Sequence, residues 1–144
     1  MLKVYHYASL TREEAKRLNS SDGGWGSEPR FTRYADITMQ GKAVAVIDGL
    51  IEREYTLVAV VDSDDLEDGF RFTNHIEHDW SKQPAAIVTP LPGSHRSTSV
   101  GDLIVRDQAT YIVKPCGFTL LGEEPKRAKP ADIQYLQVIE GGKS

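Results

Sequence analysis

The sequence predicts an α+β domain, in which an antiparallel or mixed β-sheet packs against two or three helices. Three observations indicate this class. Residues 55–61 form a continuous apolar run of the kind found in buried strands. Residues 103–105 and 111–114 are rich in β-branched and aromatic side chains, and they flank a turn at residues 106–108, which predicts a hairpin. Helical spacing appears in a further segment, at Leu66, Phe70, Thr73 and Ile76. A sheet of this kind could curl toward a barrel.

The N-terminal part predicts a strand followed by a helix. Residues 2–8 alternate as a strand does. Thr11 then begins a helix, because Glu14 stands at the capping-box position three residues later. The polar residues 19–24 end this helix, and a glycine-rich loop follows over residues 22–30. Residues 31–39 fit neither the helical nor the strand period.

The middle of the chain leaves one alternative open. Residues 43–47 are apolar and partly β-branched, and Asp48-Gly49 is typical of a hairpin turn. A helix over residues 42–54 is the other interpretation, because alanine and leucine favour helices. A second helix is predicted over residues 63–76, capped by Asp62 or Ser63, and its first turns are acidic as the helix dipole favours.

The remaining segments predict irregular structure around the hairpin. Three prolines and a glycine make residues 80–95 an irregular loop, with a short extended piece at 85–88. Residues 122–130 form a charged connector, 133–139 a last strand, and 141–144 a frayed end. We therefore expect one globular domain over residues 1–144 with a mobile C-terminal tail over 122–144.

The most distinctive motif is Arg-Ser-Thr-Ser-Val-Gly-Asp at residues 96–102, which enters the predicted hairpin. Ser99 and Asp102 have the spacing of a capping-box variant, in which a hydroxyl and a carboxylate each accept a backbone N–H. Gly101 permits a tight turn. We interpret the turn as structural. The alternative is a phosphate site, in which Arg96 and the three hydroxyls surround free N–H groups.

A resemblance rests on this motif and on the segment before it. The pieces are DLEDGFRFTNHI at residues 65–76, Trp80, RSTSVGD at 96–102, Tyr111 and Gly117-Phe118. Their order resembles the YodL-like proteins, a group of accessory proteins carried by phages, plasmids and integrative elements. The resemblance covers residues 55–121. It implies a compact α+β module from a bacterial mobile element, and it implies no catalytic residues.

Composition limits the classes of function. The net charge of −4 disfavours a generic nucleic-acid binder, which is usually basic. Cys116 is the only cysteine, so an internal disulfide is excluded and a reducing compartment is expected. No apolar run approaches the length of a membrane span, and no secretory leader is evident. We expect a cytoplasmic protein that has no membrane partner.

Few side chains suggest catalysis. His75 and His78 lie three apart on the predicted helix and could face one metal ion, but no named metal motif is present. A polar helix end is the simpler interpretation. Cys116 lies between Pro115 and Gly117, where a buried, inert cysteine is expected. We expect no cofactor, and we favour a binding protein over an enzyme.

Two binding hypotheses follow. The first is a small non-enzymatic protein that binds a host or defence protein, with Trp80 as an anchor or as a cover for the helix end. The second is a nucleic-acid module in which Trp25 stacks on bases while Arg30 and Arg33 contact phosphates. A metal-dependent hydrolase using His75 and His78 is a further alternative. The candidate binding residues are Trp25, Arg30, Arg33, Asn74, Trp80, Arg96, Ser97, Thr98, Ser99 and Asp102.

Overall fold

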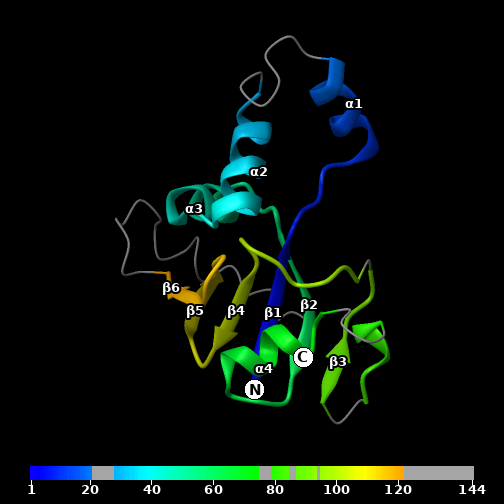
Figure 1. Cartoon of the computed structure of the whole chain (residues 1–144), viewed down its shortest axis with the longest axis vertical. Coiled ribbons are helices and arrows are strands. Elements are labelled where there is room, and N and C mark those ends of the chain that lie inside the picture. Colours follow the sequence, from blue (N-terminus) through cyan, green and yellow to red (C-terminus); the bar gives the residue numbers. More distant parts are fainter. Residues whose placement is uncertain (21–27, 75–78, 85–86, 94, 122–144) are drawn as a thin grey trace.

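The protein is built around one six-stranded antiparallel sheet, as a computed structural model shows (Figure 1). The structure describes residues 1–20, 28–74, 79–84, 87–93 and 95–121. The strand order is β3-β2-β1-β4-β5-β6. The strands are β1 (Leu2–Tyr7), β2 (Tyr55–Val61), β3 (Val88–Pro90), β4 (Leu103–Arg106), β5 (Ala109–Val113) and β6 (Phe118–Leu120). The predicted α+β class is confirmed, and the sheet is open rather than closed into a barrel.

Helices cover both faces of this sheet. They are α1 (Arg12–Ser20), α2 (Pro29–Gln40), α3 (Ala43–Ile51), α4 (Leu66–Arg71) and a 3-10 turn, η2 (Trp80–Lys82). Apolar side chains of α2 and α3 join one core cluster with alternate residues of the strands. Leu66, Phe70 and Trp80 pack in a second cluster with the other set of strand residues. Figure 1 shows α1 to α3 gathered at the upper end of the sheet and α4 across its lower part.

A β-bulge in β2 moves the odd-numbered residues of this strand from one core cluster to the other. Val4 pairs with Ala59 but Tyr5 pairs with Leu57, so Val58 is an extra residue in β2. Before the bulge, Leu57 faces the α2–α3 cluster, and after it Ala59 faces the α4 cluster. A strand without the bulge would keep both residues on one face.

The presence of helix α3 decides between a hairpin and a helix in the middle of the chain. The helical interpretation of residues 42–54 is confirmed, and the hairpin at Asp48-Gly49 is wrong. Gly49 serves close packing instead of a turn, because a Cβ there would lie 3.2 Å from the rings of Tyr7 and Tyr55. The preceding segment, for which no period was evident, is helix α2, and its residue Phe31 is fully buried.

Several predicted boundaries differ from the structure. The capping box of α1 is confirmed, since Thr11 N–H donates to Glu14 Oε1 over 2.9 Å and Glu14 N–H donates to Thr11 Oγ1 over 3.1 Å. The next helix is shorter than the predicted 63–76. It begins after Asp65, whose side chain accepts the N–H of Glu67, so the caps proposed at Asp62 and Ser63 are wrong. Strand β3 begins at residue 88, where the predicted extended piece ends.

The predicted β4–β5 hairpin is confirmed, and its register is Arg106 to Ala109 at the turn. Strand β6 is an addition to the prediction. Cys116 was expected to be buried in a strand, but it is exposed in the turn between β5 and β6. The predicted strand at 133–139 and the tail at 122–144 lie outside the described residues.

Strand β3 forms one edge of the sheet and offers few outward donors. Leu91 N–H donates to Val58 O and Asp62 N–H donates to Ile87 O, so the alternation of an antiparallel pair turns the backbone groups of Val88 and Pro90 outward. Val88 N–H already donates to Pro84 O over 3.1 Å. Pro90 has no N–H.

Candidate functional site

The Arg96–Asp102 turn closes on a buried ion pair. Asp102 is 0% exposed, and its two carboxylate oxygens accept Arg96 Nη1–H and Nη2–H over 2.6 and 2.7 Å. The same carboxylate accepts the backbone N–H of Tyr7 over 2.9 Å and that of Ser99 over 2.8 Å. Arg96 also donates to the carbonyl of Tyr7 over 2.9 Å. These bonds join the turn to the end of β1, 95 residues away in sequence.

The capping interpretation of this turn is half confirmed. The carboxylate of Asp102 accepts the N–H of Ser99, as predicted. The reciprocal bond runs from Asp102 N–H to the backbone carbonyl of Ser99 over 3.0 Å, and not to its hydroxyl. Gly101 has the expected positive φ, at +90°. Arg96 also donates to the carbonyl of Ser97 and to the hydroxyl of Ser99. The turn is therefore organised by its own side chains.

A chain of buried hydrogen bonds runs beside this ion pair. His6 Nε2 lies 2.8 Å from Thr98 Oγ1, which lies 2.7 Å from Thr73 Oγ1. Thr73 donates to the carbonyl of Gly69 over 2.7 Å, so its hydroxyl can only accept from Thr98. Thr98 must in turn accept from His6. The network therefore requires the His6 tautomer that carries its proton on Nε2 and leaves Nδ1 as an acceptor.

Burial keeps the His6 ring neutral. Its removal from water lowers the pKa to about 4, although the nearby carboxylate of Asp102 acts in the opposite direction. His6 Nε2 lies 3.9 Å from Asp102 Oδ2, but because the ring is neutral the two groups do not form an ion pair at neutral pH. Nothing near residue 6 in the sequence indicates this role, because Thr98 is 92 residues away.

Trp80 and Asn74 take part in the same packed region. Trp80 is fully buried, and its indole N–H donates to the carbonyl of Arg96 over 2.7 Å. The interpretation of Trp80 as an exposed partner anchor is therefore wrong, since its ring lies against the edges of His6 and His95. The amide of Asn74 donates to the carbonyl of Phe70 and so closes the end of α4.

Arg30 and Arg33 belong to a second network, at the junction of helices and sheet. Arg33 contacts both carboxylate oxygens of Glu54 over 2.6 and 2.8 Å. Arg30 lies 3.3 Å from a carboxylate oxygen of Glu14 and donates to the Tyr7 hydroxyl. Both arginine side chains are mostly buried and are held by carboxylates of the same chain. Trp25, their proposed partner in base stacking, lies outside the described residues.

The proposed metal ligands are not brought together in the part of the chain that the structure describes. His75 and His78 lie outside it. Two further side chains of ligand type are engaged elsewhere: His95 contacts the carbonyl of Leu91 over 2.6 Å, and Asp102 is held by Arg96. Within the described ranges no three His, Cys, Asp or Glu side chains are arranged to hold a metal ion.

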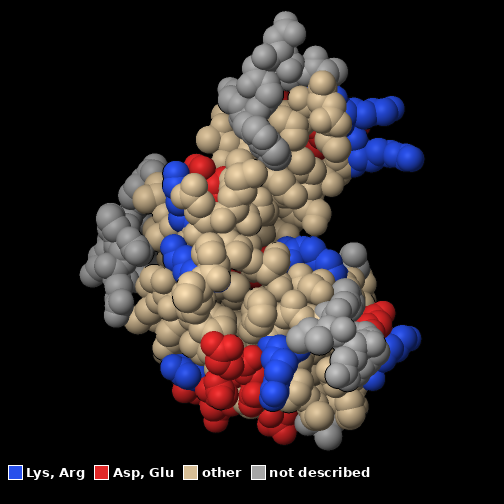
Figure 2. Space-filling model, viewed as in Figure 1, with Lys and Arg blue, Asp and Glu red and all other residues tan. Residues whose placement is uncertain are grey.

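A pocket of about 260 Å³ opens beside the Arg96–Asp102 turn. Its walls come from the end of β1, the start of β2 and the loop after β3, and we call it the β1 pocket. Figure 2 shows the surface hollowed on the side where β1 leaves the sheet for α1. The lining residues are His6, Tyr7, Ala8, Ser9, Thr56, Val58, Pro92, Gly93 and Arg96.

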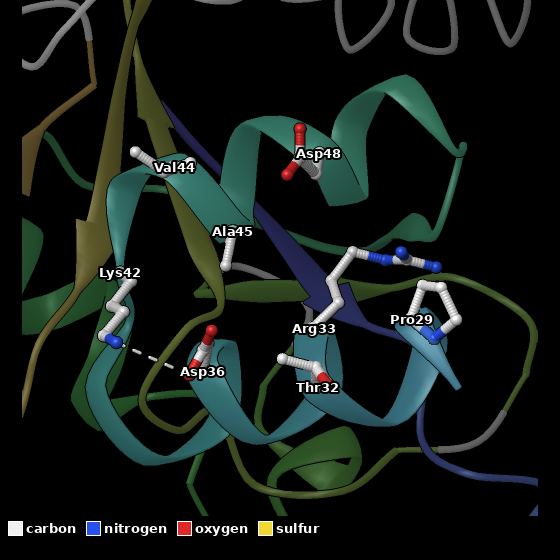
Figure 3. Close-up of a pocket in the computed structure, with 8 residues that line it drawn as sticks. All are labelled: Pro29, Thr32, Arg33, Asp36, Lys42, Val44, Ala45 and Asp48. Atoms are coloured by element: carbon white, nitrogen blue, oxygen red, sulfur yellow. Dashed lines mark ion pairs between the residues drawn. The ribbon is translucent and has the colours of Figure 1, made fainter. Parts of the chain in front are cut away.

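A larger groove of about 580 Å³ lies between α2 and α3, and we call it the α2–α3 groove. Val44, Ala45 and Asp48 line it from α3, and Figure 3 shows Ala45 pointing toward the side chains of α2. Lys42 lies 3.6 Å from Asp36 at one end. The other lining residues are Pro29, Thr32 and Arg33. No motif indicated this groove, because residues 31–39 showed no clear period.

Comparison with protein-family models, curated proteins and solved structures finds no match for this chain. The geometry of the chain itself therefore carries the functional argument. Among the described residues, no helix is both long and apolar enough to cross a bilayer.

Proposed function

We propose that this chain is a non-enzymatic binding protein of a bacterial mobile element, and that it binds a host or defence protein through the α2–α3 groove. One observation carries the proposal. In the described part of the chain four large apolar side chains are exposed, and three of them, Met39, Val44 and Ile51, lie on α2 and α3. Of these, Val44 lines the groove, and Ile51, seven residues later, lies on the same face of α3. Exposed apolar side chains beside a groove are typical of protein interaction surfaces. The mobile-element origin rests on the sequence resemblance.

The groove suits an amphipathic helix of the partner. It runs between two helices, and Val44, Ala45 and Pro29 provide apolar contacts along it. A helix that lays its apolar face into such a groove would cover Val44, which is 38% exposed, and Ile51, which is 43% exposed. Lys42, 53% exposed in its side chain, stands at the end of the groove and is paired with Asp36, so its charge toward a partner is partly compensated.

The internal contacts of the arginines disfavour the nucleic-acid alternative. Arg30, Arg33 and Arg96 each contact a carboxylate, so their charge toward a phosphate is largely compensated. Figure 2 shows many of the visible Asp and Glu side chains at the lower end of the molecule, with Lys and Arg side chains beside them. A phosphate backbone would meet negative as well as positive charge at that end.

The groove is tested by charge substitutions at Val44, which lines it, and at Ile51, on the same face of α3. Val44→Glu and Ile51→Glu should abolish capture of one defined protein from a bacterial lysate, whereas Gln108→Glu, on the exposed β4–β5 turn, should leave it intact. The captured protein should then bind purified wild-type chain directly. Unchanged capture by folded Val44→Glu and Ile51→Glu variants would refute the groove, and tight, salt-sensitive binding of DNA or RNA would refute the proposed class.

A further inference from the structure

An unpartnered imidazole nitrogen lines the β1 pocket. His6 is 5% exposed and uses Nε2 in the bond to Thr98, while its Nδ1 has no hydrogen-bond partner among the residues that the structure describes. In the described residues no enclosed side-chain nitrogen or oxygen lacks a hydrogen bond. Nδ1 must therefore be reachable from the pocket that His6 lines. A histidine that is almost wholly buried yet presents a bare acceptor to a pocket is suited to receive an N–H from a ligand.

A donor lies on the same wall. The Nη1–H and Nη2–H groups of Arg96 donate hydrogen bonds within the turn and to the end of β1; the acceptors lie on Tyr7, Ser97, Ser99 and Asp102. Its Nε–H takes part in none of these bonds. Because Asp102 compensates its charge, Arg96 does not make the pocket selective for anions.

The other walls are mixed. Ser9 and Thr56 contribute hydroxyls, while Ala8, Val58 and Pro92 contribute apolar surface. Small-molecule sites commonly combine apolar walls with a few polar groups that fix the orientation of the ligand.

We propose that the β1 pocket binds a neutral lactam edge, in which an N–H donates to His6 Nδ1 and the adjacent C=O accepts from Arg96 Nε–H. Such an edge is found on nucleobases such as uracil and on cyclic dipeptides. The site is separate from the α2–α3 groove and would give the protein a small-molecule ligand. The neutrality of His6 agrees with this assignment, because its lowered pKa leaves Nδ1 unprotonated at physiological pH.

The test is a pair of probes that differ in one hydrogen-bond donor. 2-Pyrrolidone carries both groups of the edge, whereas N-methyl-2-pyrrolidone lacks the N–H. In long-range ¹H–¹⁵N spectra of the full chain, 2-pyrrolidone should shift His6 Nδ1 and the amide of Gly93, with a Kd in the millimolar range of small fragments. N-methyl-2-pyrrolidone should shift neither, and Gln108, on the exposed turn, should move with neither probe.

Equal shifts with both probes, or none with either, would overturn the proposal. This test uses the wild-type chain, so its result does not depend on whether a variant folds. Uridine and cyclo(glycyl-glycine) then distinguish the two sources of the edge, and the tighter binder identifies the source. His6→Phe should remove binding of either ligand, while Thr56→Val should weaken it and leave the His6–Thr98 bond in place.

Discussion

Replacing Asp102 by alanine should destabilise the protein well beyond the loss of a simple cap. A cap residue contributes about 1 kcal/mol. Asp102 does more, because its carboxylate is fully buried and accepts N–H groups from Tyr7, Ser99 and Arg96. Removing one partner of a buried ion pair costs roughly 3–5 kcal/mol. The Arg96 side chain is 32% exposed, so water can partly replace the lost carboxylate, and we expect about 3 kcal/mol.

Urea unfolding followed by tryptophan fluorescence measures this loss. Asp62→Ala provides the control, because Asp62 is an exposed carboxylate and its removal should change the free energy of unfolding by no more than about 0.5 kcal/mol. Arg96→Met should also destabilise the chain, and the double variant should lose less than the sum of the two single losses. A loss near 1 kcal/mol for Asp102→Ala, with additive energies in the double variant, would refute the ion-pair argument.

Three further predictions concern the turn, the buried histidine and the first helix. Gly101→Ala should lower the melting temperature in calorimetry more than Gly117→Ala does. Both glycines have positive φ, but a Cβ at Gly101 would lie 2.4 Å from the carbonyl oxygen of Ile37, whereas a Cβ at Gly117 would have no atom within 4 Å. Equal losses in the two variants would contradict this. The pKa of His6 is about 4 in the folded protein and 6.5 in the unfolded chain. Between pH 4 and 6.5 the folded protein keeps the ring neutral, so His6 takes up a proton when the chain unfolds. The free energy of unfolding should therefore fall by up to about 3 kcal/mol as the pH drops through that window. Urea titrations should show a weaker pH dependence for His6→Phe than for the wild type, and parallel pH profiles of the two proteins would refute this. Thr11→Ala should lower stability by about 1 kcal/mol through loss of the capping box, seen as a lower melting temperature by circular dichroism; an unchanged value would count against it.

Local patterns predicted the elements whose signals are local. The capping box at Thr11, the strand Tyr55–Val61 and the β4–β5 hairpin depend on neighbouring residues, and all three are confirmed. The error at Asp48-Gly49 has a tertiary cause. The dipeptide is typical of a turn, but Gly49 is needed where two tyrosine rings press against α3.

The candidate sites depend on contacts that no local pattern reports. The motif Arg96–Asp102 was evident, but its partner His6 lies at the other end of the chain. Arg33 has the local pattern of a phosphate ligand, but its carboxylate partner Glu54 is 21 residues away in the sequence. No local pattern indicates that pair. Trp80 shows the same limit, since sequence alone does not distinguish a buried indole from an exposed one.

The outer edge of β3 has a consequence for self-association. An exposed edge strand usually templates another strand, because it presents N–H and C=O groups in alternation. Along β3 the outward N–H of Val88 already donates to Pro84, and Pro90 has none, so an incoming strand would find acceptors without the donors it also needs. A strand added at this edge would make fewer hydrogen bonds than at an ordinary edge strand, which disfavours growth of the sheet from this side.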